Sequence, residues 1–167
     1  HPQAVSGRYS DDLEKYIKFK SENVFIEIPK VRKSAIPFDL PKNDMLILKE
    51  LLYHSDVTIN PNSTLSLDAA ILNKPIINIG FDGYSDELPY YKSVKRTHNW
   101  THYRNIINSK GVRIASNISE FVSLVNDYLK DSQLDAENRK RIIKEQCYKI
   151  DGNSSKRIAN RILKILD

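Results

Sequence analysis

Residues 56–82, with the sequence DVTINPNSTLSLDAAILNKPIINIGFD, contain the pattern that decides the fold. β-Branched residues indicate a short strand at 57–60, and an isoleucine-rich run indicates another at 76–79. Between them, residues 65–72 are apolar almost all round, which predicts a buried helix rather than an amphipathic one. Pro75 ends that helix, because the residue before a proline disfavours helical geometry. The stretch therefore predicts a strand, a helix and a parallel strand, which form a βαβ unit.

The rest of the chain continues this alternation. The patterns predict strands at 24–28 and 112–115, and helices that begin after Ser10 and near residues 43, 100, 118, 135 and 154. Alternating strands and helices predict the α/β class, as a three-layer Rossmann-like parallel sheet with helices on both faces.

Local signals refine three of these helices. Asn117 and Glu120 have the spacing of a capping box and predict the start of a helix over 118–130. Gly111 is expected to be the glycine that ends the helix near residue 100. The last helix, 154–166, places isoleucine and leucine on one face and basic residues largely on the opposite face.

Composition indicates a globular chain with a basic surface. Its 167 residues are 40% hydrophobic and 28% charged, enough for one domain with its own core. The net charge of +5 favours anionic ligands or an acidic lipid surface. A nucleic-acid partner is not expected, because no dense basic run is interleaved with exposed aromatic residues. The single cysteine, Cys147, excludes an internal disulfide and fits a reducing cytosol.

The N-terminal end indicates that the sheet continues upstream. The chain opens on His1 and Pro2 with no strand before them, whereas the first strand of a doubly wound sheet is central. We therefore interpret residues 1–167 as a single Rossmann-like domain and expect a strand, and much more, before it.

The first candidate site is the start of the helix in the βαβ unit. Asn62, Ser63 and Thr64 stand where free backbone N–H groups and short hydroxyl side chains suit a phosphate or diphosphate. Asp68 lies one turn further along, where a ribose diol or two sugar hydroxyls would supply the hydrogen bonds that a buried carboxylate needs. The alternative is structural: the two hydroxyl residues cap the helix, and Asp68 bonds a neighbouring backbone group.

Other polar residues follow the second strand of the unit. Asp82 and Gly83 come at the same edge of the sheet and can reach a ligand at the neighbouring helix, although a simple Asp-Gly turn is the alternative. His98 and His102 are spaced four apart, but no third ligand has suitable spacing, so no metal site is expected. His1 could act as a general base or contact a phosphate.

Several stretches resemble one family. Residues 54–82, HSDVTINPNSTLSLDAAILNKPIINIGFD, resemble the C-terminal, donor-binding domain of GT-B-fold enzymes. They are most similar to bacterial surface-polysaccharide transferases of the CDP-glycerol glycerophosphotransferase and capsular glycosyltransferase type, and more distantly to UDP-N-acetylglucosamine 2-epimerases. HP at 1–2, THY at 101–103, GVRIASNISEFVSLVNDYL at 111–129 and CYKIDGNSSKRIANRIL at 147–163 resemble further segments of that domain, in the same order.

The resemblance implies that this chain is the C-terminal half of a GT-B fold. The whole enzyme would be a glycosyltransferase or glycerophosphotransferase of surface polysaccharide synthesis. It would transfer a sugar or polyol-phosphate group from a nucleotide-sugar or CDP-polyol donor. Ser63 and Thr64, with Asn62 beside them, would cradle the donor diphosphate. Asp68, which stands where many GT-B enzymes carry glutamate, would meet ribose or sugar hydroxyls.

Other roles follow from the same resemblance. His1 would be the catalytic residue near the phosphates, and Arg32 would help to frame the nucleotide base. Asp82 and His102 complete the implied substrate-binding set. No metal or other cofactor is implied, because the helix dipole and side chains can stabilise a leaving diphosphate. The missing N-terminal domain is the implied partner, so the chain alone should bind a donor without turnover.

Two other functions remain open. One is an epimerase-like enzyme of the same fold that acts on UDP-N-acetylglucosamine. The other is a non-catalytic, basic Rossmann-like interaction module, which predicts salt-sensitive binding to an anionic lipid or polymer and no nucleotide affinity. We expect a cytoplasmic location, with possible attachment to the inner membrane face because of the positive charge.

Overall fold

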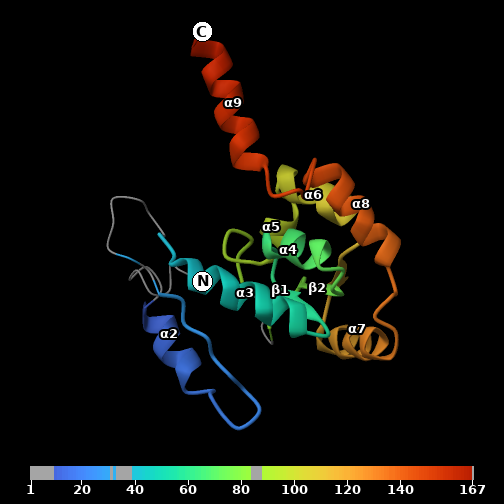
Figure 1. The fold of residues 1–167 in the computed structure, drawn as a ribbon. Helices are drawn as coiled ribbons and strands as arrows, with labels where there is room; N and C mark the ends of the chain where they lie inside the picture. Colours follow the sequence, from blue (N-terminus) through green and yellow to red (C-terminus); the bar gives the residue numbers. More distant parts are fainter. Residues whose placement is uncertain (1–9, 31, 33–38, 84–87, 167) are drawn as a thin grey trace. The chain divides into compact units, whose positions relative to one another are not determined.

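The computed structural model describes residues 10–30, 32, 39–83 and 88–166 (Figure 1). The chain divides into two compact units, His1–Leu51 and Leu52–Asp167. Within the described ranges, no helix combines the length and the apolar character that crossing a bilayer requires.

Two helices begin among the described residues of the N-terminal unit, and the second extends past the unit's last residue, Leu51. α2 covers Ser10–Ile17 and α3 covers Lys42–His54, so both expected helices form. The strand expected at 24–28 is wrong, because the only pairing in this region is an isolated antiparallel bridge between Ser21 and Val24. A strand needs a neighbour for its backbone hydrogen bonds, and no strand in the described part of this unit supplies one.

The second unit is built on a three-stranded parallel sheet. Its strands are β1 (Thr58–Asn60), β2 (Ile76–Ile79) and β3 (Arg113–Ala115), in the order β1-β2-β3. Ile59 pairs with Ile77, and both strand pairs are parallel, so the carboxyl ends of the strands lie at one edge. The predicted βαβ unit and the parallel α/β sheet are confirmed.

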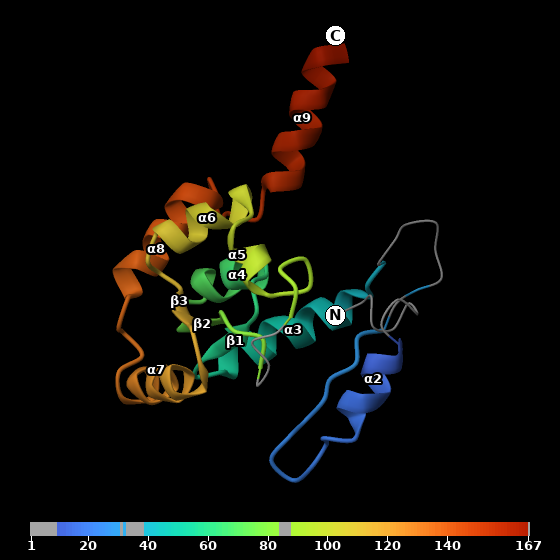
Figure 2. The same ribbon diagram turned by 180° about the vertical axis from the view of Figure 1, so that it is seen from behind.

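Helices cover both faces of this sheet (Figure 2). Ile77 packs against apolar residues of α7 (Ile118–Lys130) on one face. On the other face, the next residue, Asn78, accepts a hydrogen bond from Tyr103 of α6 (Thr101–Asn108), and Tyr103 in turn contacts Ser66 of α4 (Leu65–Ile71). Successive residues of a strand point to opposite faces, so β2 is buried on both. The remaining helices of this unit are α5 (Lys95–His98), α8 (Ala136–Gln146), which packs along α4, and α9 (Ser154–Leu166).

The predicted start of α7 is confirmed. Asn117 Oδ1 accepts a hydrogen bond from the N–H of Glu120 at 2.9 Å. Glu120 Oε2 accepts one from the N–H of Ser116 at 2.8 Å. The first bond is that of a capping box, whereas the second reaches the residue before the N-cap instead of Asn117 itself.

α4 is buried on one side only, which corrects the expected all-round burial. Ser66, Ala69 and Ala70 are buried, whereas Asp68 and Ile71 are exposed. The sheet and α8 cover the face that carries the three small residues. Residues at three- and four-residue spacing share one helical face, so the open face carries Asp68.

Gly111 has a different role from the one expected. The left-handed residue after α6 is Lys110, whose φ is 62°. A Cβ on Gly111 would lie 2.7 Å from the carbonyl oxygen of Asn138 and 2.8 Å from the backbone nitrogen of Arg139. Glycine is needed here because the backbone of α8 approaches this closely.

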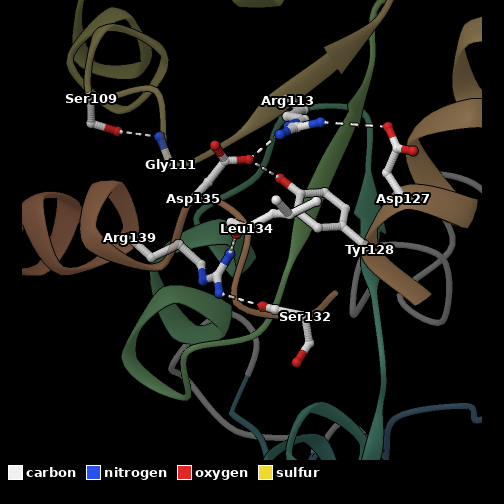
Figure 3. Close-up of polar contacts among 9 residues, drawn as sticks. All are labelled: Ser109, Gly111, Arg113, Asp127, Tyr128, Ser132, Leu134, Asp135 and Arg139. Carbon is white, nitrogen blue, oxygen red and sulfur yellow. Dashed lines mark hydrogen bonds and ion pairs between the residues drawn. The ribbon is translucent and has the colours of Figure 1, made fainter. Parts of the chain in front are cut away.

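A buried arginine joins α8 to the preceding loop (Figure 3). Arg139 is fully buried. Its Nε donates to Asn73 Oδ1 at 2.9 Å, its Nη1 to the carbonyl oxygen of Leu134 at 2.6 Å, and its Nη2 to that of Ser132 at 2.8 Å. Burial lowers the pKa of Arg139 from its ordinary value. All three guanidinium nitrogens are therefore paired with oxygens of the protein.

Asp135 forms a second part of the cluster in Figure 3. Its Oδ2 accepts hydrogen bonds from Arg113 Nε at 2.6 Å and from Tyr128 Oη at 2.8 Å. Burial, and then the bond to Asp135, raise the pKa of Tyr128. Because Arg113 is the first residue of β3, this cluster lies at the amino end of that strand, away from the carboxyl edge.

Candidate functional site

The turn between β1 and α4, residues 61–64, follows the carboxyl end of β1 and contains an unusual residue. Asn62 has a φ of 152°, which residues with a side chain rarely adopt. Its Nδ2 atom is buried and donates to no acceptor among the described residues. A buried donor without a partner costs about 1–3 kcal/mol. An unusual backbone and an unpaired donor at this edge are features that a ligand would explain.

Ser63 and Thr64 differ at the start of α4. Ser63 Oγ accepts a hydrogen bond from the N–H of Leu65 at 3.2 Å, so its hydroxyl helps to cap the first turn of the helix. Thr64 has helical backbone angles, makes no cap bond through its side chain, and is exposed. The Thr64 hydroxyl is therefore on an exposed residue and takes no part in capping the helix.

A buried polar network fastens both ends of this turn. Tyr103 Oη donates to Asn78 Oδ1 at 2.6 Å and lies 2.9 Å from Ser66 Oγ. Asn78 Nδ2 donates to Asn60 Oδ1 at 2.9 Å. These four side chains are no more than 5% exposed, and burial raises the pKa of Tyr103. The residues that flank the turn, Asn60 and Ser66, are therefore held to β2 and α6.

His98, rather than His102, contacts the turn. Its Nε2 lies 2.9 Å from the carbonyl oxygen of Pro61. A carbonyl oxygen only accepts, so this contact places a proton on Nε2. A Cβ on Gly80 would lie 3.5 Å from His98 Cε1, so the imidazole also borders the end of β2. The sequence assigns His98 no role, because its four-residue spacing from His102 lacks a third metal ligand, and no local pattern predicts its contact with a residue 37 positions earlier.

Two carboxylates of this unit have opposite pKa shifts. Hydrogen bonds from Ser93 and from the N–H of Val94, the latter 2.7 Å from Asp82 Oδ1, lower the pKa of Asp82. Partial burial of its carboxyl group raises the pKa of Asp68, although the residue as a whole is exposed. Burial also raises the pKa of the Cys147 thiol, and the charge of Asp68 adds to that shift. The bonds from Ser93 and Val94 that lower the pKa of Asp82 also hold the segment that leads into α5.

These shifts predict the outcome of a carboxyl-carbon NMR titration. Asp82 should titrate below the ordinary value of 3.8, and Asp68 should titrate above it. Because the folded-state pKa of Asp82 is depressed, its contribution to stability is present above the unfolded-state pKa and is lost as the pH falls through the folded-state value. Ser93→Ala should raise the midpoint of Asp82 and leave that of Asp68 unchanged. Equal midpoints in the wild-type protein would contradict this account.

The other expected site residues have different surroundings. His102 is exposed on α6, and its ring centroid lies 5.6 Å from that of Trp100. Arg32 belongs to the N-terminal unit, where its N–H donates to the carbonyl oxygen of Asp39 at 2.9 Å. His1 lies outside the described residues. In the described part of the chain, no cluster of three or more His, Cys, Asp or Glu residues could hold a metal ion.

Comparison with known proteins finds one family. Residues 39–164 match the family described as CDP-Glycerol:Poly(glycerophosphate) glycerophosphotransferase. The matched range contains β1, β2 and β3, the turn between β1 and α4, and the segment with His98. Comparison with curated proteins and with solved structures finds no match.

Proposed function

This chain belongs to the CDP-glycerol:poly(glycerophosphate) glycerophosphotransferase family, and we propose that it is the donor-binding domain of such an enzyme. The family is one of transferases that act in polyol-phosphate polymer synthesis. The proposal adds that an activated donor, a CDP-polyol or a nucleotide-sugar, binds at the carboxyl edge of β1. The observation that carries it is the buried Nδ2 of Asn62, which lacks an acceptor among the described residues.

The donor diphosphate would bind at the turn of residues 61–64. A phosphate oxygen would give Asn62 Nδ2 the acceptor that it lacks, and the exposed hydroxyl of Thr64 would donate a second bond. Hydrogen bonds to a charged acceptor are stronger than those between neutral groups. Ser63 would contribute by holding the turn, because its hydroxyl caps α4. Asp68 would accept hydrogen bonds from ribose or polyol hydroxyls on the open face of α4.

The transfer reaction would also need an acceptor-binding domain. An acceptor hydroxyl oxygen would bond to the β-phosphorus of a CDP-polyol, the bond from that phosphorus to the bridging oxygen would break, and CMP would leave with the electron pair. The acceptor proton would pass to a base, for which His1 remains the proposed catalytic residue. We place this chemistry in a GT-B cleft shared with an N-terminal acceptor domain, so that the chain alone binds a donor without turnover.

Asn62→Gly should separate ligand binding from stability. Glycine accepts the positive φ of this position, and the amide that it removes has no partner to lose among the described residues. The melting temperature should therefore be no lower than that of the wild type, because an unpaired buried donor and a rarely adopted φ are both removed. Affinity for CDP, measured by calorimetry, should fall by about 10- to 100-fold, because one hydrogen bond to a charged group is lost.

Lys110→Gly is the matched control. Lys110 also has a positive φ and is exposed, but it precedes β3 at the opposite edge of the sheet. The control should keep the wild-type affinity. Calorimetry with CMP, CDP, UDP and GDP should show a preference for cytidine, whereas a preference for UDP would favour a nucleotide-sugar donor. A folded wild-type sample that binds none of them at millimolar concentration would overturn the proposal.

A further inference from the structure

His98, the last residue of α5, contacts the middle of the turn between β1 and α4. The ends of the turn are held by other groups: Asn60 belongs to the buried polar network, and the hydroxyl of Ser63 helps to cap α4. Between them lie Pro61 and Asn62. Within the described ranges, His98 makes the one side-chain hydrogen bond to the backbone of these two residues, between its Nε2 atom and the carbonyl oxygen of Pro61. This contact therefore acts where the backbone has its unusual φ.

The bonded carbonyl belongs to the peptide unit that joins Pro61 to Asn62. The proline ring fixes its own φ at about −65°, so this peptide plane can turn only about ψ of Pro61 and φ of Asn62. A hydrogen bond to the carbonyl oxygen resists both rotations, because turning the plane moves the oxygen away from Nε2 of His98. His98 therefore helps to hold Asn62 at its φ of 152°, and with it the direction of the buried Nδ2 atom.

Asp82 helps to fix the position of α5, and so of His98. Asp82 Oδ1 accepts a hydrogen bond from the N–H of Val94 at 2.7 Å, and Ser93 gives the carboxylate a second one. Ser93 is buried, and Thr97 Oγ1 donates to the carbonyl oxygen of Val94 at 2.6 Å. The carboxylate that follows β2 is thus linked, through α5 and His98, to the turn that follows β1.

We propose that His98 is a positioning residue for the donor: by holding the carbonyl of Pro61, its imidazole aims the Asn62 amide at the bound diphosphate. This inference rests on the donor site proposed above. A donor group that is already aimed loses less conformational freedom when the ligand binds, so the contact should raise affinity. The competing explanation is that the imidazole touches the phosphate directly. In that case, His98 would contribute to affinity even without the Asn62 amide.

Two amide substitutions that differ by one methylene group test this proposal in the 167-residue chain. The amide of His98→Gln can extend as far as the Nε2 atom of the imidazole and still donate to Pro61, whereas the amide of His98→Asn is too short. His98→Asn should therefore lower the affinity for CDP, measured by calorimetry, by about 3- to 10-fold. His98→Gln should stay within about twofold of the wild type.

The NMR signals of the Asn62 side-chain amide show whether His98 acts through that residue. These signals are identified by their absence from the spectrum of Asn62→Gly. Without ligand, His98→Asn should shift them and His98→Gln should leave them in place, a difference that a loss of overall stability would not produce. In the Asn62→Gly background, adding His98→Asn should change the affinity by no more than about twofold, because the amide that His98 aims is gone.

His54→Asn is the matched control. The ring of His54 is exposed at the end of α3, with its centroid 5.1 Å from that of Tyr53, and this variant should bind CDP as the wild type does. A His98→Gln variant as weak as His98→Asn, or an undiminished effect of His98→Asn in the Asn62→Gly background, would overturn the proposal. A wild-type chain that binds no CDP would overturn the donor site itself, whereas binding that is unchanged by His98→Asn would overturn this inference alone.

Discussion

Replacing Arg139 by methionine is expected to lower the free energy of unfolding by about 3 to 5 kcal/mol. The guanidinium is fully buried and donates to Asn73 Oδ1 and to the carbonyl oxygens of Leu134 and Ser132. Methionine fills much of the same space but donates nothing, so three protein oxygens lose the donor that the buried guanidinium supplies. Urea unfolding, followed by circular dichroism, measures the change.

Arg141→Met is the control on the same helix. Arg141 pairs with Glu145 at 2.6 Å, but the two side chains are 58% and 39% exposed. Exposed ion pairs contribute little, so the free energy of unfolding should change by no more than about 0.5 kcal/mol. If the two methionine variants proved equally stable, the bonds of Arg139 would not be what holds the loop before α8 in place.

Replacing Asn78 by leucine is expected to cost about 3 kcal/mol and to weaken nucleotide binding as well. Asn78 is fully buried, accepts from Tyr103 Oη, and donates to Asn60 Oδ1 and to the carbonyl oxygen of Asn60. Leucine cannot bond to these groups, so they lose their hydrogen bonds inside the protein. Because Asn60 precedes the turn that contains Asn62, its loosening should reduce the affinity for CDP together with the stability.

Asn105→Leu is the control for this change. Asn105 is exposed on α6, the helix that carries Tyr103, so leucine there should change the free energy of unfolding by no more than about 0.5 kcal/mol. A double-mutant cycle with Tyr103→Phe should give a coupling energy of about 0.5–3 kcal/mol with Asn78→Leu. Additive effects of the two substitutions would rule out a shared network.

The elements of the second unit were predictable from the sequence because their signals are local. The capping box at Asn117 and the isoleucine run of β2 each lie within a few residues of the structure that they specify. The strand expected at 24–28 failed for the opposite reason. Its residues have strand character, but a strand exists only with a neighbour, and no local pattern shows whether one is present.

The candidate site likewise has some features that the sequence predicts and others that depend on tertiary packing. The position of the turn at residues 61–64 and the capping role of Ser63 follow from turn residues placed before an apolar helix. The φ of Asn62 and the burial of its amide depend on packing around the turn. The contact between His98 and Pro61 joins segments that are distant in sequence, so spacing alone could not predict it.

The sequence by itself determined the order of strands and helices in the second unit, its parallel sheet and its candidate ligand edge, because hydrophobic period, turn residues and caps act over a few positions. Only the tertiary structure decided that Gly111 is needed for the approach of α8, that α4 leaves Asp68 on an open face, and that His98 reaches the turn. Those features depend on contacts between separate helices, strands and loops. The local conformational preferences of single residues do not specify such contacts.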